Sequence, residues 1–136
     1  MPKPKKKVIT NDKSIDQAEQ KLGIKYPQII RDKLKKRNGF YWGYFRFFCV
    51  LDGEDKFHTF DDIVRENENP SAGWKRYLPE GHIAIANEDL LCLALNTEKD
   101  GKVYFYDHGS GKLEVFADSN EKLKQKLDKQ DQELDQ

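Results

Sequence analysis

The sequence predicts an α+β domain: a mostly antiparallel sheet of about five to six strands, with N-terminal helices and a C-terminal helix packed on it. Helical periodicity fills the N-terminal part, and short apolar runs with turn residues fill the middle. A last amphipathic segment closes the chain, whose 136 residues suit one domain. We expect the domain to span residues 14–128, between a flexible basic arm (1–13) and a polar tail (129–136).

The first helix is predicted over residues 14–23, SIDQAEQKLG. Ser14 and Gln17 stand at the spacing of a capping box, and three apolar residues form a stripe along one side. Gly23 suits the position after the last helical residue, where a left-handed backbone conformation is common.

A second helix and a first β segment follow. Residues 26–39 read as a helix with Pro27 in its first turn and basic residues crowding its last turn. Residues 40–51, FYWGYFRFFCVL, are too aromatic and β-branched for a surface helix. They predict a strand or hairpin, with Gly43 marking a bend or bulge.

The middle of the chain predicts one more helix and two strands. Residues 60–69 form the helix, with Thr59 as its cap, and a loop covers residues 71–81. The strand HIAIAN comes next, at residues 82–87. The run at 90–96 is apolar from Leu90 to Leu95, which indicates a central strand buried on both faces.

The last part predicts a hairpin and a helix. KVYFY (102–106) and KLEVF (112–116) are joined by His-Gly-Ser-Gly, whose glycines suit a turn. Leu123 and Leu127 give a short amphipathic helix before the polar tail. We expect the helices to lie on one side of the sheet.

Bulk properties narrow the class of protein. The chain is 37% hydrophobic, 35% charged and 12% aromatic, which favours a soluble folded domain over a disordered chain. It has no apolar run of about 20 residues for a membrane span, and no apolar region after its basic N-terminus for a secretory signal. Cys49 and Cys92 sit in apolar runs, which favours buried free thiols and a cytoplasmic location.

The zero net charge hides an asymmetry. Residues 1–39 hold 12 Lys/Arg against 4 Asp/Glu, and residues 40–136 hold 12 against 20. Residues 52–107 alone hold 13 acidic and 6 basic residues. Such a split favours a charged partner, unless folding brings the two parts together.

The acidic part, residues 52–107, also contains Trp74 and Tyr77. Aromatic anchors beside charged side chains are typical of protein interfaces. The alternative is that Trp74 packs at the edge of the core and does not contact a partner. The candidate partner-binding residues are Asp61, Asp62, Trp74, Glu88 and Asp89, with Tyr41 and Trp42 as outside candidates.

A hydrolase site is another possibility, because Asp107, His108 and Ser110 lie within four positions. A nucleophilic triad needs a base bonded to the nucleophile and oriented by a third group. No G-x-S-x-G elbow surrounds Ser110, and the surrounding glycines fit a hairpin turn. We therefore favour the turn and predict no catalytic residues.

Metal and cofactor chemistry finds little support. The side chains of His58, His82, His108, Cys49 and Cys92 show no ligand spacing, and no phosphate-binding or dinucleotide motif occurs. The basic arm offers too few phosphate contacts for more than weak nucleic-acid binding, and a solubilising role is the alternative. We expect no cofactor, no metal and no nucleic-acid partner.

The order of these pieces resembles the SUKH superfamily, the Smi1-like domain, over about residues 14–127. That family has a helix ending in Leu-Gly, a nearby Pro, a second helix ending in Asn-Gly-Gly, an Ile-Ala strand, a short buried strand and a V-Y-x-x-D-H strand. The matching residues are Leu22, Gly23, Pro27, Asn38, Gly39, Ile85, Ala86, Val103, Tyr104, Asp107 and His108. Phe40 departs from the pattern, and Asn87-Glu88-Asp89 replace its usual Gly-rich turn.

The resemblance implies a non-enzymatic fold. Many bacterial members look like immunity proteins, which stay in the cytoplasm and block the toxic domain of a polymorphic toxin, often a nuclease or deaminase. Other relatives, including fungal ones, act in cell-wall regulation and signalling. The leading hypothesis is thus an immunity protein that binds a nuclease-type toxin, and the alternative is a regulatory or scaffold module.

Overall fold

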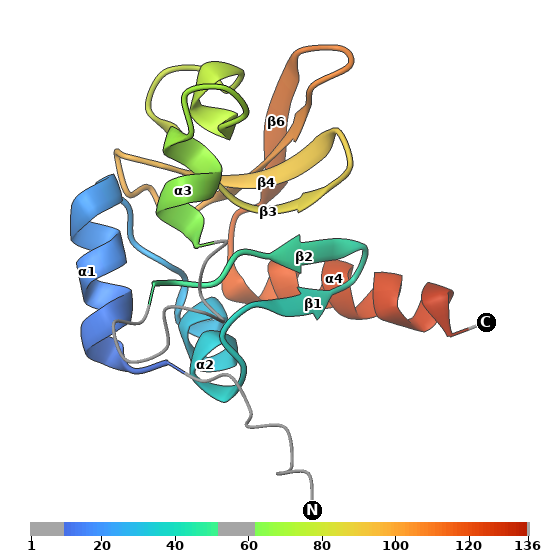
Figure 1. Cartoon of the computed structure of the whole chain (residues 1–136). Helices are drawn as coiled ribbons and strands as arrows, with labels where there is room; N and C mark the ends of the chain where they lie inside the picture. The colour runs from blue at the N-terminus through green and yellow to red at the C-terminus, as the bar shows by residue number, and fades with distance from the viewer. Residues whose placement is uncertain (1–9, 52–61, 136) are drawn as a thin grey trace, which may run out of the picture.

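The computed structural model describes residues 10–51 and 62–135, and it confirms the α+β class (Figure 1). The helices are α1 (Asp12–Leu22), α2 (Gln28–Lys36), α3 (Ile63–Glu68), the 3₁₀ turn η1 (Trp74–Arg76) and α4 (Asn120–Leu134). The strands are β1 (Phe40–Trp42), β2 (Phe45–Phe47), β3 (His82–Glu88), β4 (Leu91–Asn96), β5 (Val103–Asp107) and β6 (Lys112–Ala117).

The described strands form one antiparallel sheet in the order β1 to β6, so each strand pairs with its neighbours in the sequence. Short connections suffice for such pairing. The side chains of β4 from Cys92 to Leu95 are buried, which confirms a central strand covered on both faces.

Helices cover both faces of this sheet, and the expectation that they lie on one side was wrong. Successive side chains of a strand point to opposite faces, so Tyr41 and Trp42 mark the two faces of β1. Arg46 is opposite Tyr41 and lies 3.7 Å from Glu66 of α3. Trp42 instead donates a 2.8 Å hydrogen bond to Asp128 of α4. Because β4 is apolar from Leu91 to Leu95, side chains on both of its faces must be covered.

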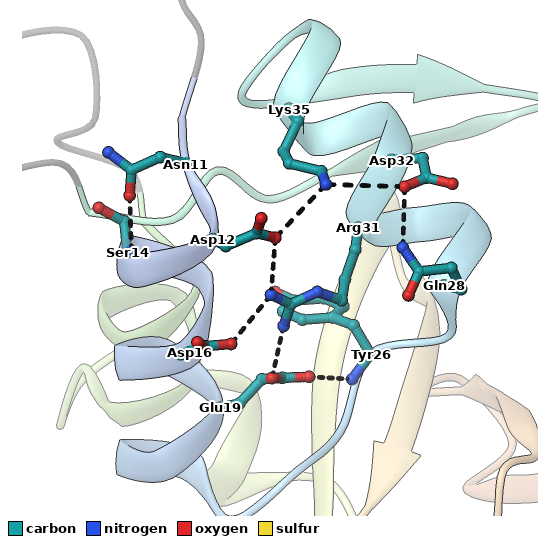
Figure 2. A network of polar contacts seen from close by, with 10 residues as sticks. All are labelled: Asn11, Asp12, Ser14, Asp16, Glu19, Tyr26, Gln28, Arg31, Asp32 and Lys35. Atoms are coloured by element: carbon teal, nitrogen blue, oxygen red, sulfur yellow. Dashed lines mark hydrogen bonds and ion pairs between the residues drawn. The ribbon is translucent and has the colours of Figure 1, made fainter.

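An ionic network joins α1 to α2 (Figure 2). The guanidinium of Arg31 on α2 contacts Glu19 at 2.6 Å, Asp16 at 2.9 Å and Asp12 at 3.0 Å, all on α1. The other oxygen of Glu19 accepts the backbone N–H of Tyr26 at 2.6 Å. Acidic residues of the basic N-terminal part are thus already paired inside that part.

Two helix caps differ from those predicted. Asn11, not Ser14, caps α1, because its side chain accepts the Ser14 N–H at 2.9 Å and the helix starts at residue 12. The cap of α3 is Asp62, whose carboxylate accepts two backbone N–H groups, while the predicted Thr59 lies outside the described residues. Gly23 ends α1 with a φ of 72°, as predicted.

The last turns of α4, which the sequence analysis assigned to a polar tail, hold the β1–β2 turn. Asp131 accepts the backbone N–H of Gly43 at 2.8 Å, and Gln130 accepts that of Tyr44 at 3.0 Å. Figure 1 shows α4 running along this hairpin. The C-terminal helix therefore fixes the outermost strand pair on the β1 side of the sheet.

Candidate protein-binding surface

The turn between β3 and β4 carries two predicted contact residues, Glu88 and Asp89. Glu88 pairs with Leu91, so Asp89 and Leu90 alone connect the strands. Asp89 has a φ of 52°, a left-handed conformation that Asp tolerates better than most residues. The side chain of Leu90 is half exposed, at 50%. The turn therefore presents two acidic groups beside an exposed apolar one.

An aromatic group lies next to this turn. The backbone N–H of His108 donates to the carbonyl of Leu90 at 2.9 Å. The rings of His108 and Tyr77 have centroids 4.4 Å apart, and Trp74 meets Tyr77 edge to face at 6.5 Å. The hydroxyl of Tyr106 donates to the Tyr77 carbonyl at 2.9 Å. These contacts fix η1 and its aromatic side chains against the end of β5.

We call this region the sheet-end surface. It consists of Trp74, Tyr77, Glu88, Asp89, Leu90 and His108. Tyr41, which is 77% exposed, flanks the aromatic part of this surface. Strand register puts Tyr41 on the same face of the sheet as Arg46 and Asn87, whereas Glu88, the next residue of β3, points to the opposite face.

The two carboxylates of the turn are available to a partner. Within residues 10–51 and 62–135, no side chain or backbone group forms a hydrogen bond or ion pair with the carboxylate of Glu88 or Asp89. Nearby acidic groups are occupied: Glu66 pairs with Arg46, and Asp107 accepts the Gly109 N–H at 2.9 Å. The turn therefore carries locally uncompensated negative charge, which favours a positively charged partner.

Two of the predicted residues, Asp62 and Trp42, do not join this surface. Asp62 is buried and caps α3, and Trp42 is only 2% exposed. The indole of Trp42 lies between α4 and the ammonium of Lys33, which is 4.2 Å from the ring centroid. Asp61 lies outside the described residues. Glu88, Asp89 and the flanking Tyr41 are thus the exposed part of the predicted set, whereas Trp74 is partly buried and packs against the core.

Three residues of the surface, Tyr77, Leu90 and His108, were not among the predicted contacts. Leu90 was assigned to the buried strand because it continues the apolar run of β4. The polar triplet Asn87-Glu88-Asp89 before that run was the signal for a turn at this point. His108 was matched to the end of the V-Y-x-x-D-H strand, and only tertiary contact places it against Tyr77.

The β5–β6 connection is a turn, as the sequence analysis favoured. Its polar side chains serve the turn: Asp107 accepts the Gly109 N–H, and the Ser110 hydroxyl accepts the Lys112 N–H at 3.3 Å. Nδ1 of His108 has no hydrogen-bond partner among the described residues. Asp107, His108 and Ser110 therefore do not form the hydrogen-bonded relay of a triad.

The described residues contain no group of three or more His, Cys, Asp or Glu side chains placed to hold a metal ion, and His58 lies outside them. Burial raises the pKa of the Cys92 thiol to about 12, so this thiol is protonated at neutral pH and is a poor nucleophile. The described helices include none long and apolar enough to cross a membrane.

A groove of about 770 Å³ separates α1 from α3. Ala18, Leu51 and Val64 contribute its apolar lining, and Lys21 and Glu68 bring opposite charges. Because these charges are mixed, the lining does not specify an occupant.

Comparison with known protein families gives a match over most of this fold. The model of the SMI1 / KNR4 family (SUKH-1) matches residues 9–125. The matched segment runs from α1 through β6 into α4 and contains the complete sheet-end surface. A search of curated proteins finds no match.

Proposed function

This chain belongs to the SMI1 / KNR4 family (SUKH-1), and we propose that it is an immunity protein. It binds a cognate polymorphic toxin in the cytoplasm and neutralises it by stoichiometric binding, without catalysis. The family relationship supports a role in protein binding. The observation that carries the proposal on this chain is the sheet-end surface, where the β3–β4 turn exposes two carboxylates without partners among the described residues beside the exposed Leu90, and where Tyr77 is partly exposed near the end of β5.

The charge of that surface favours a nuclease-type toxin domain. Such a domain needs a positively charged cleft for its nucleic-acid substrate. An acidic surface is attracted to the cleft, speeds association and competes with the phosphates. Trp74 and Tyr77 supply the kind of side chains that dominate binding energy in protein interfaces. Tyr41 extends the contact area across β1.

The alternative function is a regulatory or scaffold module of the cell-wall or signalling type. It would use the same surface for a partner that is not a toxin. A neighbouring reading frame that encodes a long secreted protein with a toxic C-terminal domain separates the two functions.

Co-expression with the C-terminal domain encoded by that neighbouring frame tests the proposal. We expect growth to be rescued and the two proteins to purify together. A catalytically dead form of the toxin domain, used in the same purification, controls for survivors that carry toxin mutations. Toxicity without rescue, together with no complex, would contradict the immunity function.

A further inference from the structure

We propose that two copies of this chain associate through strand β6. Residues 111–115 of one copy pair antiparallel with the same residues of the other, and Leu113 faces Leu113 on the two-fold axis. This association goes beyond the proposed function, because it needs only a second copy of the chain and no toxin.

The first step is that β6 has an open edge. Among the described strands β6 pairs only with β5. Backbone N–H and C=O groups alternate between the two sides of a strand, so the outer side of β6 carries groups that β5 does not satisfy. Within the described residues, other bonds to the β6 backbone occur only near its ends, where the Lys112 N–H donates to Ser110 and the Phe116 carbonyl accepts Lys126. Residues 113–115 are therefore open to a further strand, and Figure 1 shows this part of β6 away from α4.

The second step is the apolar face of β6. Leu113 and Val115 are opposite Tyr106 and Tyr104 of β5, so all four side chains point to one face of the sheet. Val115 is 47% exposed, and Leu113 is only partly buried against the core. When Leu113 lies on the axis, Val115 of each copy is diagonal to Leu113 of the other, within reach of side-chain contact. The pairing therefore buries exposed apolar surface of both copies in one cluster.

The third step is the charge on the opposite face of β6. Lys112 and Glu114 point to that face, and their side chains are 71% and 53% exposed. They lie 3.5 Å apart within one copy, an exposed ion pair that water screens. In the proposed pairing Lys112 of each copy is opposite Glu114 of the other. The axis thus generates two cross-strand pairs of opposite charge.

The same charges select the register. A shift of two residues in one direction sets Lys112 opposite Lys112, and a shift in the other direction sets Glu114 opposite Glu114, which is unfavourable. A shift of one residue places the apolar face of one copy beside the charged face of the other. A single register therefore suits both faces. This self-complementarity is what a two-fold interface requires, and it identifies the occupant of the edge as a second copy of the chain.

Sedimentation of the full chain over a range of concentrations tests the association. We expect a monomer that converts to a dimer as the concentration rises. Lys112→Glu and Glu114→Lys each set like charges opposite one another and should weaken the dimer about tenfold or more. An equimolar mixture of the two variants should dimerise again, because both cross-strand pairs are then of opposite charge. The matched controls, Lys129→Glu and Glu98→Lys, change exposed residues elsewhere and should each dimerise as the wild type does.

Cysteine cross-linking tests the position of the axis. Leu113→Cys places two thiols opposite each other in the dimer, so mild oxidation should join the copies. Val115→Cys is the control, because residue 115 is opposite residue 111 and its two copies are separated along the strands. The native Cys49 and Cys92 are buried and should not contribute.

A chain that stays monomeric at every concentration would overturn the proposal. So would a dimer that neither charge variant weakens, a mixture that does not restore association, or equal cross-linking at positions 113 and 115. Toxin neutralisation by a monomeric chain would remove the dimer alone, and a dimer that fails to neutralise the toxin would remove the immunity function alone.

Discussion

At the scale of single residues, Arg31 joins α2 to α1 through ion pairs. Its side chain is only 13% exposed, and it contacts three carboxylates of α1. Glu19 is 14% exposed, whereas Asp12 and Asp16 are mostly in solvent. The Glu19 contact therefore carries most of the energy, since water screens exposed ion pairs.

Arg31→Ala should lower the free energy of unfolding by about 2–3 kcal/mol, because it leaves the poorly solvated Glu19 carboxylate without its cation. Asp16→Asn, which removes one exposed contact, should cost no more than about 0.5 kcal/mol. Urea denaturation measures both. Equal effects of the two changes would contradict the assignment.

Asp128 makes one residue-scale prediction on pH. The Lys124 ammonium and then the Trp42 indole N–H lower its pKa below the ordinary value of 3.8. Since the pKa is lowered in the folded state, the stabilisation is present above pH 3.8 and is lost as the pH falls through the folded pKa. The Trp42 indole N–H resonance should report a midpoint below 3.8. A midpoint at or above this value would contradict the contact.

The sequence shows which side chains are suited to an interface, but it does not show which of them are used inside the fold. Trp42 and Asp62 were both chosen as partner contacts because an aromatic and an acidic side chain suit an interface. In the structure Trp42 is buried against α4, and Asp62 caps α3. Nothing local to Trp42 reveals this, because its partner Asp128 comes from the far end of the chain. The role of Asp62 is local, since it accepts the N–H groups of Val64 and Arg65, and Asp is a preferred helix cap.

At the scale of elements, the contact between α4 and the β1–β2 hairpin is the most informative. Gly43 has a φ of 61°, and a Cβ atom there would lie 2.3 Å from the Gln130 side-chain oxygen and 3.0 Å from Leu127. A side chain at residue 43 would therefore displace the Gln130 oxygen that accepts the Tyr44 N–H and would crowd Leu127.

Gly43→Ala should destabilise the protein by about 2–3 kcal/mol, as backbone strain adds to the clash. Gly101→Ala is the matched control, because its φ is 80° but no atom lies within 4 Å of the added Cβ. It reports the strain alone, about 1 kcal/mol. Thermal unfolding measures both, and equal losses would show that α4 does not press on the turn.

Most elements were predictable from local pattern. The β1–β2 hairpin, the apolar β4 and the β5–β6 turn follow from residue type and spacing, which need no tertiary information. The placement of helices on both faces was missed, although the apolar β4 contained the signal for it. The last turns of α4 were also missed, because their polar side chains stabilise the helix only by bonding to the distant hairpin.

At the scale of the whole molecule, the fold determines which charged side chains are paired, whereas the sequence gives only their number. Carboxylates of α1 pair with Arg31, and those at the end of α4 bond to the hairpin. The turn with Glu88 and Asp89 keeps its charge unpaired among the described residues. The sequence predicts these two residues as partner contacts, which stays a prediction, and it does not show which other carboxylates pair inside the fold.

Charge reversal of the turn should act on association with the toxin domain. Glu88→Lys/Asp89→Lys should slow association about tenfold or more at low ionic strength and flatten its salt dependence, because steering is electrostatic. Glu98→Lys/Asp135→Lys makes the same change in net charge elsewhere. Stopped-flow kinetics compares them, and unchanged rates in the first variant would remove the turn from the interface.

The most direct test of neutralisation by stoichiometric binding is a titration of toxin activity. The C-terminal domain encoded by the neighbouring frame is assayed on its nucleic-acid substrate at concentrations far above the dissociation constant, while this chain is added. We predict a linear loss of activity that reaches zero at one chain per toxin domain. Full toxin activity at a molar excess of the chain, or complete loss at a small fraction of an equivalent, would contradict the proposed function.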